Sequence, residues 1–222
     1  MRILRYHSPL MTFLTRLADI ILLNVLWIVC SLPLITAGAA TTALYSCTLN
    51  LDEPTEQPVV RRFFRAFGAG FGKSTALFAV WVVAMALVAL DVLFYLYIIE
   101  DLDTWFRVLF MIPAFILLLI SSYLFPLHAR FETSLGQLLK NAVSLTIVHL
   151  PTTALIAVLN CVPVLLLFLK TDIFLYLLAV WTLFGFSLIA YLNSYFLKKI
   201  FRMHLPEETE EGIQDGADIS KN

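Results

Sequence analysis

Long apolar runs without a charged residue are the feature that most constrains this chain. Residues 74–90, 108–127 and 173–197 contain no Asp, Glu, Lys or Arg, and a helix needs about 20 apolar residues to cross the hydrocarbon of a bilayer. Charged residues make up only 14% of the sequence, whereas a soluble domain carries roughly 25%. The chain is therefore predicted to be an integral membrane protein.

Helices are the only structure that fits these runs. Backbone amides in hydrocarbon must be hydrogen-bonded within their own segment, and the runs lack the alternating pattern of barrel strands. The sequence predicts an all-α membrane domain over residues 1–205 and a disordered, acidic cytoplasmic tail over residues 206–222. Six spans are expected, at residues 17–32, 34–51, 74–99, 106–127, 149–169 and 173–197.

The distribution of basic residues predicts the orientation. Six spans with a cytoplasmic N-terminus leave only Arg107 and Lys170 outside, so 13 of the 15 basic residues lie inside. If residues 17–51 cross only once, the best division is 10 to 5. Both termini are therefore expected in the cytoplasm.

Two cytoplasmic segments have helical character. RRFFRAFGAGFGK at residues 61–73 alternates arginine with phenylalanine, as in helices that lie at a membrane interface. FETSLGQLLKNAVSL at residues 131–145 has helical periodicity after a turn.

No catalytic, metal or cofactor site is predicted. Residues 68–75 end like a phosphate-binding loop, but Phe67 occupies the position of the first glycine and no strand precedes it. The three cysteines have no metal-binding spacing, and neither HExxH nor GxSxG occurs. The chain is expected not to be an enzyme and to need no cofactor.

Ionisable residues inside the spans are the first functional candidates, because charge is costly in hydrocarbon. Asp91 lies about 8 residues, or roughly 12 Å, below the outer end of its span. A structural pair with Arg107 is favoured over a transport site. Asp19 is expected to pair with Arg16, three residues earlier.

Buried amides are expected to hold helices together. Asn24, Asn160 and Asn193 lie deep in their spans, where asparagine can bond to a neighbouring helix or to a polar substrate.

The second span is rich in small residues. Gly38, Thr42 and Ser46 recur every four residues, a spacing that allows close helix packing. Pro33 followed by this weakly hydrophobic segment also resembles the interrupted helices that line transporter cavities. Packing is the main expectation, and a role in function stays open.

Several motifs resemble those of one family. They are LNVLW at 23–27, CSLPLITAGAATTALY at 30–45, FFRAF at 63–67, FPL at 125–127 followed by Arg130, and KNA at 140–142. They are similar to the YesL-like family, bacterial multi-pass membrane proteins of unknown function, over roughly residues 10–200. The glycine-rich residues 68–72 depart from the family's usual polar loop.

The resemblance implies an association with carbohydrate uptake in bacteria. We expect a non-enzymatic accessory protein of the bacterial cytoplasmic membrane, with the lipid bilayer and a carbohydrate transporter or membrane regulator as partners, and no nucleic acid. The alternative is a small homo-oligomeric transporter or channel for a polar solute. The candidate functional or packing residues are Asn24, Pro33, Thr36, Gly38, Thr42, Asp91, Arg107, Pro126 and Arg130.

Overall fold

The computed structural model describes residues 9–53, 57–97, 104–131, 133–167 and 173–204. Within these ranges the chain is helical and contains no strand, which confirms the all-α prediction. The acidic tail predicted at residues 206–222 lies outside the described residues. The elements are α1 (Pro9–Ser31), η1 (Leu34–Thr36), α2 (Ala37–Leu49), α3 (Val59–Ala69), α4 (Phe71–Tyr97), α5 (Thr104–Arg130), α6 (Leu135–Val148), α7 (Leu150–Leu167) and α8 (Ile173–His204).

Four helices, α1, α4, α5 and α8, are long and apolar enough to cross a membrane. The α6–α7 pair, bent by 106°, brings the number of candidate spans to at most five in the described part of the chain. The expected second span is instead the 13-residue helix α2, about 20 Å long at 1.5 Å per residue. A lipid-facing span needs about 30 Å, so the count of six is not established by length and composition.

Helix α2 lies at the centre of the molecule. It contacts α1, α3, α4, α5 and α8, and most of its side chains are buried. A helix enclosed by protein on nearly all sides does not need the uniformly apolar surface that lipid demands. This enclosed position explains why residues 34–51 are less hydrophobic than the other predicted spans. The buried residues are Gly38, Ala39, Ala40, Thr42, Ala43, Leu44, Tyr45, Cys47, Thr48 and Leu49.

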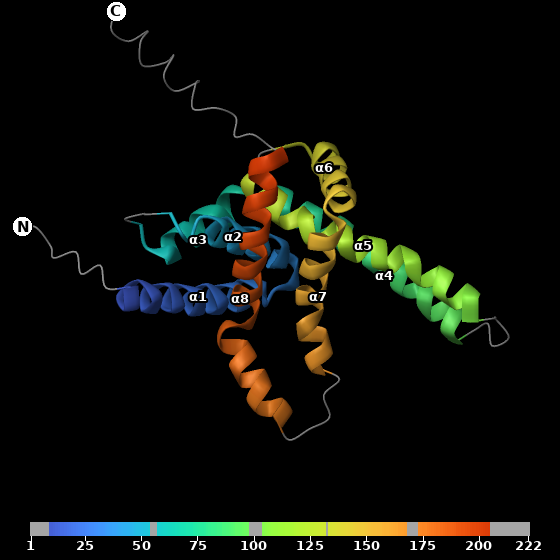
Figure 1. Cartoon of the computed structure of the whole chain (residues 1–222), viewed down its shortest axis with the longest axis horizontal. Helices are drawn as coiled ribbons and strands as arrows, with labels where there is room; N and C mark the ends of the chain where they lie inside the picture. The colour runs from blue at the N-terminus through green and yellow to red at the C-terminus, as the bar shows by residue number, and fades with distance from the viewer. Residues whose placement is uncertain (1–8, 54–56, 98–103, 132, 168–172, 205–222) are drawn as a thin grey trace, which may run out of the picture.

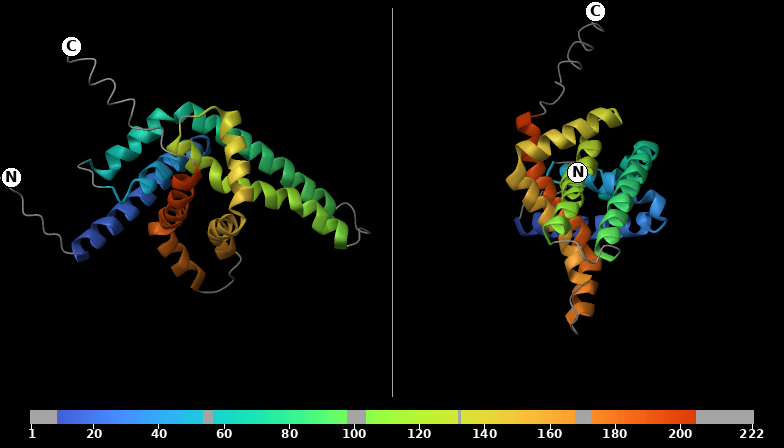
Figure 2. Two further views of the ribbon diagram at one scale, coloured as in Figure 1. Left: turned by 45° about the horizontal axis from the view of Figure 1, so that its top comes forward. Right: turned by 90° about the vertical axis from the view of Figure 1, so that its right-hand side faces the viewer.

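The other helices extend from α2 in different directions. Figure 1 shows the α4–α5 pair running to one side, while α7 and the first half of α8 run to another. The same divergence is visible in the left view of Figure 2, where α3 and α6 lie near the end at which the long helices meet. Helix α3 packs on α1 and α2, and α6 packs on α5. These two helices correspond to the segments expected between spans.

Small residues let α2 and α4 approach closely. A Cβ atom added to Gly38 would lie 2.5 Å from the carbonyl oxygen of Ser74 and would also overlap Cβ of Phe78. The Thr42 hydroxyl donates to the carbonyl oxygen of Gly38 at 3.0 Å, so it is satisfied within α2. Gly38 and Thr42 are thus packing residues in this fold.

The chain reverses direction between α1 and α2. Thr36 Oγ1 donates to the carbonyl oxygen of Cys30, and the indole of Trp27 donates to Thr41 Oγ1 at 3.1 Å. Pro33, just before η1, stands where α1 has ended. Pro33 and Thr36 therefore shape the reversal that returns α2 alongside α1.

Candidate functional site

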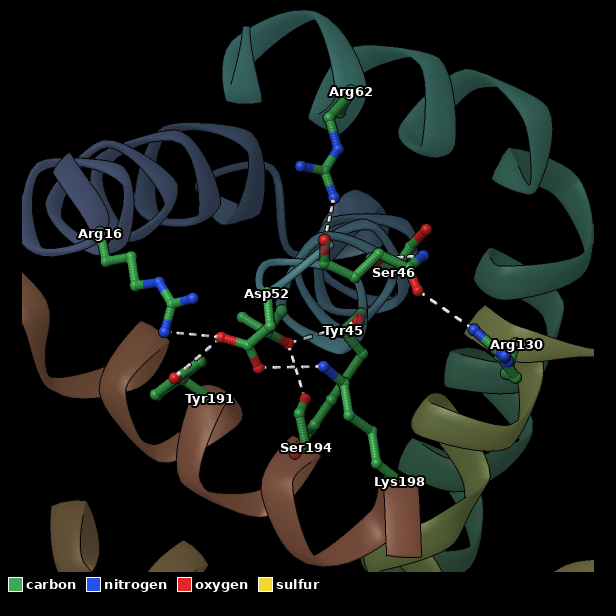
Figure 3. A network of polar contacts seen from close by, with 11 residues as sticks. Arg16, Tyr45, Ser46, Asp52, Arg62, Arg130, Tyr191, Ser194 and Lys198 are labelled. Carbon is green, nitrogen blue, oxygen red and sulfur yellow. Dashed lines mark hydrogen bonds and ion pairs between the residues drawn. The ribbon is translucent and has the colours of Figure 1, made fainter. Parts of the chain in front are cut away.

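Asp52, just after α2, is the centre of a polar network drawn from distant helices (Figure 3). Its carboxylate accepts from Arg16 Nη1 of α1 at 3.0 Å and from Lys198 Nζ of α8 at 3.1 Å. The Tyr191 hydroxyl of α8 donates to it at 3.3 Å. Asp52 thus joins α1 to α8.

Asn50 makes the equivalent connection to α3 and α5. Its carbonyl oxygen accepts from Arg62 Nη2 at 2.9 Å, and its side-chain Oδ1 accepts from Arg130 Nη1 at 3.1 Å (Figure 3). Its amide nitrogen donates to the carbonyl oxygen of Ser46 at 3.2 Å. The turn after α2 is therefore held by four helices. We call this network the polar hub: Arg16, Asn50, Asp52, Arg62, Arg130, Tyr191 and Lys198.

The charge of Asp52 is stabilised within the polar hub. Partial burial by itself would raise the pKa of this carboxyl. Three neighbouring residues outweigh the effect of burial and lower the pKa of Asp52. Lys198 contributes a hydrogen bond and its charge, Arg16 contributes its charge, and Tyr191 contributes a hydrogen bond. Asp52 is therefore ionised at neutral pH.

We expect Asp52→Asn to reduce stability by about 1 kcal/mol, a modest value because 39% of the side chain is exposed and screened by solvent. The folded pKa lies below the ordinary value of 3.8, so this stabilisation is present above that pH and is lost as the pH falls through the folded pKa. Thermal unfolding in mild detergent between pH 7 and pH 3 should show this loss in the parent protein and a smaller one in Asp52→Asn. Glu53→Gln, which removes the adjacent charge, is the control. Equal pH profiles for the parent and Asp52→Asn would contradict the assignment.

Asn24 ties α1 to α8 within the apolar part of the molecule. Its amide nitrogen donates to the carbonyl oxygen of Thr182 at 2.6 Å, and its Oδ1 accepts from the backbone N–H of Ser187 at 2.9 Å. These two groups are five residues apart on α8, so one side chain bonds to two successive turns of that helix. Helix α8 changes direction partway along its length in Figure 1.

A second buried amide cluster joins α2, α7 and α8. Asn193 Nδ2 donates to Asn160 Oδ1 at 2.8 Å and to the Tyr45 hydroxyl at 3.3 Å. Tyr45 and Asn160 also line an open pocket of about 210 Å³ whose other walls come from α1, α2, α7 and α8. The remaining lining residues are Trp27, Thr41, Leu44, Pro163, Phe186, Ile189 and Ala190.

The other candidate residues lie apart from these groups. Asp91 is half-buried on α4. Arg107 is on α5, and its side chain lies outside the described part of the chain, so the expected Asp91–Arg107 pair stays a prediction. Pro126 is buried inside the last turns of α5, and Arg130 is the final residue of that helix and a member of the polar hub.

One expected pair is wrong. Arg16 forms its ion pair with Asp52 and not with Asp19. The i, i+3 spacing offered a local partner, but the return of α2 beside α1 brings a carboxylate from 36 positions further along the chain. Only the tertiary structure supplies that partner.

Sequence reasoning missed the centre of the polar hub. The sequence patterns do not single out Asn50, Asp52 or Tyr191, and Lys198 is only one of the 13 basic residues expected on the cytoplasmic side. A usable signal was present, since Asn50 and Asp52 follow a small-residue helix and the basic residues stand at the ends of other helices. Among the residues that the structure describes, no three His, Cys, Asp or Glu side chains gather as a metal site.

Comparison with known proteins identifies one related segment. Residues 20–92 match the model of a family described as "Protein of unknown function, DUF624". The matched segment covers α1 from Ile20, the reversal, α2, α3 and most of α4. No curated protein and no solved structure matches the chain.

Proposed function

We propose that this chain is a non-enzymatic accessory protein of a bacterial cytoplasmic membrane that acts with a carbohydrate uptake or sensing system. The motifs at residues 23–45, which resemble the YesL-like family, lie inside the segment that matches the DUF624 model. YesL belongs to DUF624. The association with carbohydrate uptake comes from that resemblance.

The proposal includes six crossings with both termini in the cytoplasm. Arg16 and Asp52 are in contact, so the segment between them returns to the level from which it started. Lys198 and Arg130, near the ends of α8 and α5, meet the same turn through Asp52 and Asn50. Basic residues gathered at one end of a membrane bundle favour the cytoplasmic side. The short helix α2 can cross because protein, rather than lipid, surrounds it.

The exposed residues on the outward face of α3 support a role in binding another protein. Phe63 is fully buried against the core, whereas Phe64 is 50% exposed and is flanked by the exposed Arg61 and Arg65. The outer residues are therefore not needed to pack the fold. A face that combines an aromatic ring with arginines is suited to a partner with acidic side chains at the membrane surface.

A photoreactive amino acid at position 64 tests the proposal in intact cells. We expect cross-linking to a subunit or regulator of a carbohydrate transporter, identified by mass spectrometry. The cross-link should weaken when Arg61→Glu and Arg65→Glu reverse the charge of the face. The same probe at Val80, which is 64% exposed on the apolar surface of α4, is the control and should label lipid.

The pocket beside Tyr45 and Asn160 favours a second function, a small oligomeric transporter for a polar solute. Polar groups that face an open pocket among membrane helices are a feature of solute pathways. The cross-linking result at position 64 distinguishes the two functions, because a transporter that works alone needs no other protein at α3. Cross-links only to lipid or to a second copy of the chain would contradict the accessory function.

A further inference from the structure

A small basic pocket adjoins the polar hub. Its volume is about 60 Å³, enough for a few water molecules or one compact anion. The walls come from the end of α2, the turn after it, the end of α5 and the last part of α8. The lining residues are Leu49, Glu53, Arg130, Phe131, Lys198, Phe201 and Arg202.

In the described part of the chain, basic side chains outnumber carboxylates around this pocket. Among the residues that the structure describes, five basic side chains and three carboxylates surround the turn after α2, since Asp19 interacts electrostatically with Arg62, and the net formal charge is +2. The C-terminal ends of α2, α5 and α8 each contribute roughly −0.5. About +0.5 therefore remains, so neutralising helix ends does not account for all the cations. The basic residues are Arg16, Arg62, Arg130, Lys198 and Arg202, and the acids are Asp19, Asp52 and Glu53.

Two basic side chains of α8, Lys198 and Arg202, lie where one ligand could contact both. Lys198 and Arg202 are four residues apart and so lie on the same face of the helix. Lys198 gives one contact to Asp52 at 3.1 Å, and an ammonium carries three N–H donors. Within the described part of the chain, no hydrogen bond or ion pair engages Arg202. A planar guanidinium beside an ammonium suits the oxygens of a phosphate.

Aromatic rings close one side of the pocket. The rings of Phe131 and Phe201 meet edge to face with centroids 5.7 Å apart, and Phe201 is buried. An apolar wall lowers the local dielectric and strengthens the attraction between a bound anion and the cations. Glu53 is the one carboxylate among the described lining residues, and it opposes anion binding.

We propose that this pocket binds a phosphate group through Lys198 and Arg202, with Arg130 contributing to the positive potential. The group comes either from the headgroup of an anionic phospholipid or from a soluble phosphate. This inference goes beyond the proposed function, because the pocket can be occupied whether or not a partner docks on α3.

Two arms of one experiment distinguish the sources. The full chain in uncharged detergent is titrated with inorganic phosphate at constant ionic strength, and thermal unfolding is followed by tryptophan fluorescence. A ligand that binds only the folded state raises the unfolding temperature. In the second arm, protein released from vesicles of phosphatidylglycerol and phosphatidylcholine is examined by native mass spectrometry for retained lipid.

Three variants make the test specific. Arg202→Gln should weaken phosphate affinity, or phosphatidylglycerol retention, about tenfold, the effect of losing one charge-assisted hydrogen bond. Lys199→Gln removes the same charge from an exposed neighbouring position outside the pocket and should change neither readout. Glu53→Gln should strengthen binding.

Phosphate binding that depends on Arg202 would identify a soluble ligand, and selective retention of phosphatidylglycerol that depends on Arg202 would identify a lipid headgroup. Absence of both would overturn the proposal. Equal losses in Arg202→Gln and Lys199→Gln would also overturn it, because they would mean that the attraction comes from diffuse surface charge.

Discussion

Gly38→Ala should destabilise the folded protein by about 3 kcal/mol, at the upper end of the usual cost of overpacking. The new methyl group would meet the backbone oxygen of Ser74 and Cβ of Phe78, and neither atom can move away by a side-chain rotation. Helices α2 and α4 would have to separate, which would disturb the other contacts of α2. Alanine gains up to about 1 kcal/mol over glycine in a helix, so the steric cost prevails. Thermal unfolding in mild detergent, read by gel filtration after heating, measures the change.

Gly136→Ala is the matched control for this substitution. Gly136 is also helical, in the first turn of α6, but an added Cβ there has no atom within 4 Å. The parent stability, or a slight increase, is expected. If Gly38→Ala were as stable as the parent, the close contact between α2 and α4 would be wrong.

Asn24→Leu should cost about 2 kcal/mol, although leucine has the same branching of side-chain heavy atoms and is more compatible with lipid. The backbone N–H of Ser187 would lose its acceptor in the interior, and a buried donor without a partner costs about 1–3 kcal/mol. Interhelical hydrogen bonds in membrane proteins average less, about 0.6 kcal/mol with a maximum near 1.7. We expect a larger effect here because one side chain makes two contacts with α8.

Thr15→Val provides the control on the same helix. The Thr15 hydroxyl donates only to the carbonyl oxygen of Met11 within α1, so its loss should change stability by no more than a few tenths of a kcal/mol. Amide hydrogen exchange would give a second readout for Asn24→Leu, namely faster exchange around Ser187. Unchanged exchange and unchanged stability together would show that α8 keeps its shape without Asn24.

The sequence could predict much of the fold because membrane helices follow local rules. Apolar length identified α1, α4, α5 and α8, and the alternation of arginine with phenylalanine indicated α3. The small residues of α2 indicated close packing, which Gly38 shows. These features depend on hydrophobicity, side-chain size and charge along short stretches, all of which can be read without knowing which helices touch.

The candidate site could be predicted only in part. Asn24 is a candidate because polar groups within hydrocarbon need partners, and Arg130 because it follows the FPL motif that resembles the YesL-like family; both have partners. Asp52 was not, because an acid in a loop is ordinary until α1 and α8 surround it. Its partners Arg16 and Lys198 are 36 and 146 positions away, and no pattern along the chain encodes that proximity.

The sequence by itself determined that the chain is an all-helical membrane protein, with basic residues beside its apolar segments and no recognisable catalytic motif. Every apolar segment in hydrocarbon must form a helix to satisfy its own backbone hydrogen bonds, whichever segments lie beside it. Only the tertiary structure decided that α2 is a short, enclosed helix and that Asn50 and Asp52 join four others at its end. The reason is that the length a helix needs depends on whether lipid or protein surrounds it, and an ion pair forms wherever folding brings opposite charges together.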